Sequence, residues 1–113
     1  MNYHGSMLET AMANENFRQV MVTEENIQLL VMCLNPKEEI GVDTIEADQV
    51  VFIVSGEGEA MVNDETFAVS GGDVAIVPAN SRFNFIANGS EPLKLYIVCT
   101  PPKYEESLVE KTK

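Results

Sequence analysis

Few side chains in this sequence could do chemistry, and the best candidates carry oxygen. Asp43, Glu46 and Gln49 stand close together, and hard cations accept carboxylate and amide oxygens as ligands. The single histidine, His4, lies far from them near the start of the chain and cannot supply several imidazole ligands. Because acidic residues in a loop more often form a solvated face, we predict no metal and no cofactor. A cation held by Gln49 with Asp43 or Glu46 is the alternative.

Covalent catalysis and phosphate binding lack their usual sequence patterns. The run Gly56-Glu57-Gly58 is not a dinucleotide fingerprint, since the third glycine is missing and no helical pattern follows. The sequence has neither a G-x-S-x-G elbow nor a second histidine to act as a base for a serine or cysteine nucleophile. We therefore predict no catalytic residues and favour a protein that is not an enzyme.

The elements that must position these residues are short strands. The segment Val50–Val54 is apolar without a break and four of its residues are β-branched, which is typical of a strand covered on both faces. The glycines of Ser55–Gly58 permit a sharp turn, after which apolar residues resume at Ala60–Val62. Gln49 stands at the mouth of this central strand, and its role decides the functional interpretation.

The rest of the chain repeats this rhythm of apolar segments and turns. Turn signals recur roughly every 8–12 residues, and no convincing amphipathic helix is present. The sequence therefore predicts an all-β sandwich or barrel with little or no helix over residues 17–102, between a flexible leader at 1–16 and a charged tail at 103–113. The expected strands are Phe17–Val22, Ile27–Leu34, Ile40–Ile45, Val50–Val54, Ala60–Val62, Thr66–Val69, Val74–Val77, Arg82–Ile86 and Leu93–Cys99.

Composition limits the partners and the compartment. A chain of 113 residues with 45% apolar residues can build one domain with an ordinary core. Its formal charge of −11 repels nucleic acid and anionic membranes, and no apolar run approaches the ~20 residues that span a bilayer. Without a secretory signal pattern we expect a cytoplasmic protein, in which Cys33 and Cys99, each inside an apolar run, are buried free thiols.

The order of strands, glycines and prolines from about Phe17 to Pro102 resembles a small single-domain cupin, a double-stranded β-helix or jelly-roll barrel. Gln49, followed by six residues and Gly56, is similar to the second half of the first cupin motif, and Gly72 with Pro78 to the start of the second. Within the cupins, Asp48-Gln49, Gly56-Glu57-Gly58 and Leu93–Tyr96 with Pro101-Pro102 most resemble the proteins labelled mannose-6-phosphate-isomerase-like.

The departures from the cupin motifs fall on the metal ligands. The resemblance implies two histidines in the first motif, where this chain has Asp43 and Ile45, or Val42 and Thr44 with the other loop length. It implies another histidine in the second motif, where this chain has Phe83, a residue that cannot bind a metal. The metal-binding motifs are therefore degenerate.

Three residues are the candidates for ligand binding. The resemblance implies that the Gln49 side chain points into the barrel and that Phe83 occupies the place of the metal, and Tyr96 could bring a hydroxyl group to the same pocket. We predict a metal-free cupin that binds a small molecule or serves as an interaction module. The alternative is a metal-dependent cupin enzyme of the isomerase or oxygenase type with non-histidine ligands.

A homodimer is also expected. Strands such as Val50–Val54 and Ile27–Leu34 are apolar on both faces, whereas a two-sheet barrel covers only one face of each sheet. An exposed apolar face needs a partner, and the resemblance to small cupins likewise implies dimers.

Overall fold

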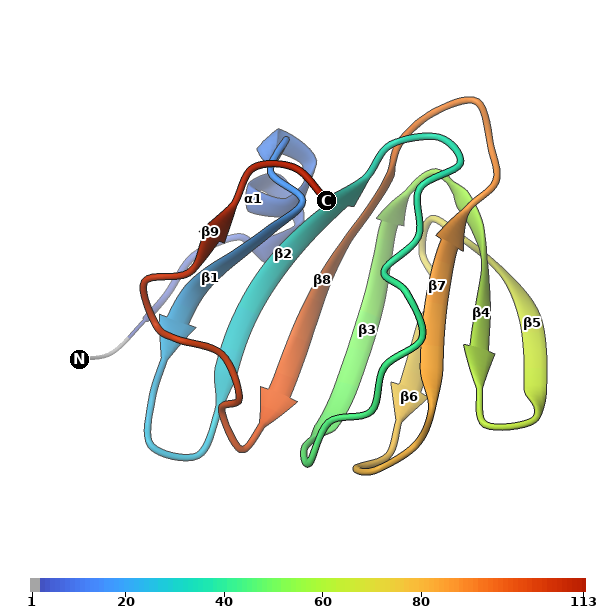
Figure 1. Ribbon diagram of the computed structural model, residues 1–113. Helices are drawn as coiled ribbons and strands as arrows, with labels where there is room; N and C mark the ends of the chain where they lie inside the picture. The colour runs from blue at the N-terminus through green and yellow to red at the C-terminus, as the bar shows by residue number, and fades with distance from the viewer. Residues whose placement is uncertain (1–2) are drawn as a thin grey trace.

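Two antiparallel sheets face each other in the computed structural model, which describes residues 3–113 (Figure 1). The larger sheet has six strands in the order β6-β3-β8-β2-β1-β9, and the smaller has three in the order β5-β4-β7. The all-β prediction is confirmed. Over these residues the elements are α1 (Met7–Ala13), β1 (Arg18–Thr23), β2 (Gln28–Leu34), β3 (Asp48–Ser55), β4 (Glu57–Val62), β5 (Glu65–Ser70), β6 (Val74–Val77), β7 (Phe83–Ala87), β8 (Leu93–Thr100) and β9 (Val109–Glu110).

The core lies between the two sheets and follows from the alternation of each strand. In β3 the side chains of Val51 and Ile53 are buried while their neighbours are half-buried, and β8 alternates in the same way. The inner side chains of both strands meet Phe85 of β7 and Ala60 of β4, which are also buried. The outer side chains of these strands are apolar as well. The strands therefore alternate between buried and half-buried side chains, although they do not alternate between apolar and polar residues.

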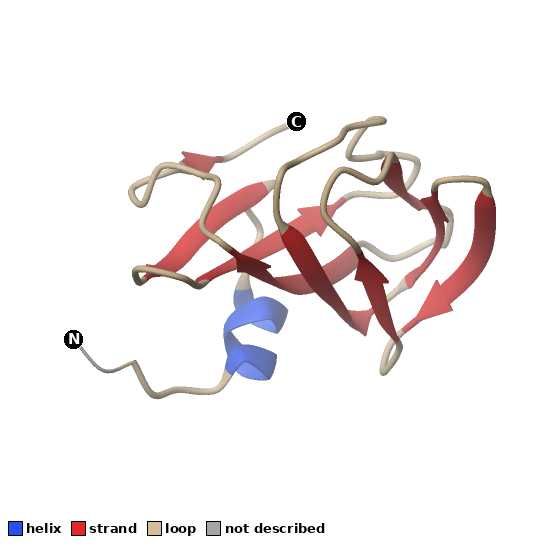
Figure 2. Ribbon diagram, turned by 90° about the horizontal axis from the view of Figure 1, so that it is seen from below, coloured by secondary structure: helices blue, strands red, loops and turns tan. Residues whose placement is uncertain are grey.

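Helix α1 falls inside the segment expected to be a flexible leader. Its N-terminus is capped by the Ser6 hydroxyl, which accepts a hydrogen bond from the Glu9 backbone N–H at 3.1 Å. The helix packs against the outer face of the six-stranded sheet, where Ala11 is fully buried (Figure 2). With seven residues the helix is too short to show a helical period in the sequence. Within residues 3–113 no helix is long and apolar enough to cross a membrane.

The prediction of a strand at Ile40–Ile45 is wrong. Residues 35–47 form a loop along the small sheet, touching it through isolated bridges from Glu39 to Ile86 and from Asp43 to Phe83. Gly41 has a φ of +97°, which turns the chain out of an extended path between the two bridges. The segment therefore alternates between apolar and polar residues although it is a loop. It buries Ile40 without forming continuous β-ladder hydrogen bonds.

The expected charged tail returns to the barrel. We call residues 103–113 the C-terminal strap. Within it β9 pairs with β1, and Tyr104 and Leu108 pack against the core. Strand β9 forms the edge of the six-stranded sheet, and the rest of the strap lies on the inner side of this sheet, opposite α1 (Figure 2). The inner layer therefore consists of the small sheet, the loop at 35–47 and the strap.

The turn between β3 and β4 predicts a sharp difference between two glycine substitutions. Gly56 and Gly72 both have positive φ, +93° and +98°, so alanine at either position costs about 1–2 kcal/mol of backbone strain. A methyl group on Gly56 would also collide with the Pro92 carbonyl oxygen, whereas one on Gly72 would meet nothing within 4 Å. We expect Gly56→Ala to lower the free energy of unfolding by a further roughly 1–3 kcal/mol.

Urea unfolding of both variants measures this difference. Gly72→Ala is the matched control, because it shares the backbone strain and lacks the collision. Equal losses of stability in the two variants would contradict the close approach of Pro92 to the turn.

Candidate functional site

Gln49 lies at the start of β3 and points between the sheets. Its backbone pairs with Val77 of β6 and Cys99 of β8, and its side chain shares the inner face with Val51. The residue is 2% exposed, and its Nε2 donor has no hydrogen-bond partner in the described part of the chain. A buried donor without a partner costs about 1–3 kcal/mol, so this amide is placed for a reason other than stability.

Phe83, at the start of β7, lies next to the position of the first motif. Its backbone N–H donates to the Asp43 carbonyl oxygen at 3.0 Å, and the Asp43 N–H donates to the Phe83 carbonyl oxygen at 3.0 Å. The Phe83 ring is 3% exposed and belongs to the hydrophobic core. The structure therefore brings Phe83 and Asp43 together, as the motif positions require, but presents a hydrocarbon ring at this place in the barrel.

The carboxylates considered as alternative cation ligands point to solvent. Asp43 and Glu46 are exposed, and Asp43 Oδ1 accepts a hydrogen bond from the Thr44 N–H at 2.8 Å. In the described residues no three His, Cys, Asp or Glu side chains are grouped so that they could hold a metal ion. The donor set that the structure assembles around Gln49 does not fit the metal that the cupin resemblance implies.

Tyr96 is not brought together with the other two candidate residues. It lies on β8 between the buried residues Leu95 and Ile97, and strand alternation turns its ring to the outer face of the sheet. There it stacks on Phe52 of β3, with ring centroids 4.7 Å apart and an interplanar angle of 19°. Of the three predicted ligand-binding residues, Gln49 and Phe83 are inside the barrel and Tyr96 is outside.

Gln28 was not among the predicted site residues, although it is fully buried at the start of β2. Its Oε1 accepts hydrogen bonds from the backbone N–H groups of Lys103 and Tyr104, at 3.2 and 3.1 Å. Its Nε2 donates to the Tyr104 carbonyl oxygen at 2.8 Å and to Thr23 Oγ1 at 2.9 Å. One amide therefore anchors the beginning of the C-terminal strap to the large sheet. The sequence signal was a polar residue on the apolar side of a strand.

Arg18 is the second inner residue that sequence reasoning missed. Its Nη1 donates to Glu110 Oε1 at 2.7 Å across the β1–β9 pair. The guanidinium carbon lies 5.1 Å from the centre of the Phe17 ring and 5.0 Å from that of Tyr104, so two aromatic faces receive the cation. Its Nε is buried and has no hydrogen-bond partner among residues 3–113.

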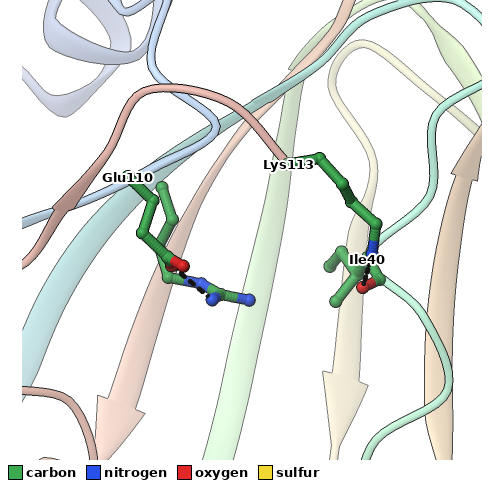
Figure 3. A network of polar contacts seen from close by, with 4 residues as sticks. Ile40, Glu110 and Lys113 are labelled. Atoms are coloured by element: carbon green, nitrogen blue, oxygen red, sulfur yellow. Dashed lines mark hydrogen bonds and ion pairs between the residues drawn. The ribbon is translucent and has the colours of Figure 1, made fainter.

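The end of the strap is fixed to the loop at 35–47. Lys113 Nζ donates to the Ile40 carbonyl oxygen at 2.6 Å (Figure 3). The same Nζ lies 5.6 Å from the centre of the Phe17 ring. Glu110 and Lys113 thus reach from the strap to two different elements, β1 and the loop. Together with Gln28, these contacts close the inner layer over β1 and β2.

Burial favours the neutral forms of one phenol and two thiols by raising their pKa values. Desolvation raises the pKa of Tyr104, and the nearby Arg18 guanidinium opposes this only in part. Burial likewise raises the pKa of Cys99, against the lowering effect of Lys103, and it raises the pKa of Cys33 on the outer side of β2. Both cysteines are free and buried, as predicted. Thiols and a phenol in this state are poor nucleophiles at neutral pH.

A separate hollow opens to solvent at the other end of β3. It has a volume of about 620 Å³ and is bordered by α1 and the turns at residues 55–57 and 89–92. Lys94 crosses one side, where its Nζ donates to the Met12 carbonyl oxygen at 2.6 Å. None of the predicted ligand-binding residues lines it. Because the hollow contains none of these residues, we place the candidate site inside the barrel, around Gln49.

The two facing antiparallel sheets, with the motif residues Gln49 and Phe83 turned inward, define a jelly-roll barrel. The profile described as the cupin domain matches residues 30–99, and the chain belongs to the cupin family. The predicted cupin-like jelly roll is thereby confirmed. A comparison with curated proteins found no match.

Solved structures similar to this chain share its fold. A protein of Bacillus halodurans, BH2720, is 23% identical with a TM-score of 0.96, over 99% of this chain and 90% of its own. An RmlC-like cupin of Shewanella frigidimarina is 19% identical with a TM-score of 0.70, over 76% of each chain. KdgF of a Halomonas species is 16% identical with a TM-score of 0.71, over 76% of this chain and 78% of its own. At these identities the likeness concerns architecture alone.

The raised pKa of Tyr104 predicts a loss of stability at alkaline pH. Because the phenol is neutral and buried in the folded protein, its contribution is complete below the unfolded pKa of about 10 and is lost as pH rises through the higher folded pKa. We expect Tyr104→Phe to lose less free energy of unfolding than the wild type between roughly pH 9 and pH 11. Urea titrations at a series of pH values measure this. Parallel curves for the two proteins would show that Tyr104 ionises as easily in the folded chain as in the unfolded one.

Proposed function

We propose that this protein is a metal-independent cupin that binds a small molecule inside its barrel. The observation that carries this proposal is the combination at the motif positions: a buried Gln49 amide whose Nε2 is unpaired within residues 3–113, and a buried Phe83 ring on the facing sheet. An amide donor in an apolar interior is suited to a ligand carbonyl or hydroxyl group. Ile45, at another motif position, packs on the same core and adds an apolar wall.

The metal-dependent alternative finds less support in this geometry. An isomerase or oxygenase with non-histidine ligands would need Asp43 or Glu46 to join Gln49, but both carboxylates are exposed while Gln49 is buried. Turning them inward would bring charged groups against Phe83 and Ile45, at a desolvation cost that only a bound cation could offset. We therefore favour binding without catalysis.

The expected partners and compartment follow the same proposal. The charge of −11 opposes nucleic acid and anionic membranes, which supports a small molecule as the main ligand. The free thiols of Cys33 and Cys99 suit a reducing compartment and support a cytoplasmic location. The narrower likeness to mannose-6-phosphate-isomerase-like proteins stays a prediction.

We also propose that two copies associate through the outer face of the six-stranded sheet. Val74 and Ile76 of β6 are exposed there, and Phe52 and Tyr96 present a stacked aromatic pair on the neighbouring strands. Strand β6 is the edge of the sheet, so its outer backbone groups are open to pairing as well. A second copy offers the same apolar face and the same strand edge, so the two can pair about a two-fold axis. A charged partner would match this apolar face less well.

Metal independence predicts a clear result in elemental analysis. Untagged protein incubated with Mn²⁺, Fe²⁺ or Zn²⁺ and then dialysed should retain far less than one equivalent, because Phe83 and Ile45 offer no ligand atoms. The variant carrying Ile45→His and Phe83→His is the matched control, since it restores imidazoles beside Gln49 and should gain Zn²⁺. One equivalent in the wild type, lost on Gln49→Ala, would overturn the proposal.

The dimer predicts a change of mass on a single substitution. Ile76→Lys places a charge on the outer face and should convert the dimer to a monomer, as measured by sedimentation equilibrium or light scattering. Val42→Lys is the control, because Val42 is 56% exposed on the loop at 35–47 and Ile76 is 57% exposed on β6. A wild type that is monomeric at high concentration, or an Ile76→Lys variant that stays dimeric, would remove this face from consideration.

A further inference from the structure

The Arg18 guanidinium can bind an anion through several N–H donors, and its partner Glu110 occupies only one of them. Glu110 takes a single hydrogen bond, from Nη1 at 2.7 Å. The buried Nε donor stays without a partner in the described chain. A free carboxylate can accept from Nε and an Nη group together, in the side-on geometry that makes arginine a strong carboxylate receptor. The strap carboxylate, fixed by the β1–β9 pairing, does not achieve this geometry.

The same guanidinium lies between two aromatic faces of different origin. Phe17 is a buried core residue immediately before β1, whereas Tyr104 belongs to the strap. Movement of the strap would therefore remove one ring and the carboxylate of Glu110 together, and would leave Phe17 and Arg18 in place. It would also free Gln28 Oε1 from the backbone of residues 103 and 104, while Nε2 would lose the Tyr104 carbonyl oxygen and keep its bond to Thr23 Oγ1.

A ligand at Arg18 can replace part of the contacts that hold the strap, those of Glu110 and Tyr104. Strand β9 has two residues, and most of the strap side chains are exposed or half-buried. Its anchors are one ion pair, the Lys113 bond to a carbonyl oxygen and the Gln28 amide. Backbone bonds from Phe17 and Val20 and the packing of Tyr104 and Leu108 on the core add to them. Short terminal segments with few buried contacts open at low free-energy cost relative to the whole fold.

We propose that Arg18 is the recognition residue of a covered site for a small aromatic monocarboxylic acid. Once the strap releases Arg18, the ligand carboxylate binds Nε and Nη2, the two donors that face the same side of the guanidinium, and its ring takes the place of Tyr104 against the guanidinium. This inference goes beyond the proposed function, because it places a second site at Arg18 rather than at Gln49 and names its ligand class. The charge of −11 disfavours ligands with several negative charges, so one carboxylate on an uncharged ring is the class that fits.

Binding of benzoate to three variants tests this site. Glu110→Gln removes the competing carboxylate while keeping the shape of the side chain, and it should bind benzoate roughly three- to tenfold more tightly than the wild type, because the open form is more populated. Glu106→Gln is the matched control: it removes the same charge from an exposed position of the strap and should leave the affinity unchanged. Arg18→Lys keeps the charge but loses the two-donor geometry and should weaken binding at least about tenfold.

Titration calorimetry gives the affinities, and the Nε–H resonance of Arg18, assigned by its absence in Arg18→Lys, reports contact directly. Benzoate should shift this resonance, whereas neutral benzamide should not. Weaker binding of cyclohexanecarboxylate than of benzoate supports the stacked ring. Equal affinities for Glu110→Gln and Glu106→Gln, an unshifted resonance, or no binding to Glu110→Gln would each overturn the inference. Metal content is measured separately, so a metal-free protein that ignores benzoate would refute this site and leave the proposed function standing.

Discussion

The inner face of the six-stranded sheet has to be buried, and three strands are too few to bury it. Neighbouring strands lie roughly 4.8 Å apart, so the small sheet spans about half the width of the large one. The loop at 35–47 and the C-terminal strap supply the rest of the inner layer, joined to each other by Lys113 and the Ile40 carbonyl oxygen (Figure 1). The barrel is therefore complete only when the strap is in place, and the strap covers the polar interior residues Arg18 and Gln28.

This division of the interior separates two kinds of environment. On the side of β3 and β7 the residues at the motif positions are apolar, apart from the amide of Gln49. On the side of β1 and β2 the interior holds a cation and an amide, Arg18 and Gln28, whose partners come largely from the strap. These two groups tie the strap to the six-stranded sheet, so polar contacts as well as apolar packing close this side of the barrel.

Strand positions could be predicted from the sequence because they depend on local signals. Unbroken apolar runs such as Val50–Val54 and the glycine turn after them correspond closely to β3 and its exit, and the inward direction of Gln49 followed from the motif. The roles of Arg18 and Tyr104 could not be predicted, because each depends on a contact across more than eighty positions in sequence. The error at Ile40–Ile45 has a local cause: alternation in polarity resembles a strand, while Gly41 breaks the backbone geometry.

Helix α1 divides the outer face of the large sheet into a covered and an open area. Beneath it Val31 and Cys33 are shielded although they point away from the core, whereas Val74 and Ile76 remain accessible. Leu8 and Met12, one helical turn apart, form an apolar rim at the border. A second molecule docking on the open strands would abut this rim and could not slide across the sheet. In the proposed dimer, the short N-terminal helix would therefore act as a stop and would fix the alignment of the two barrels.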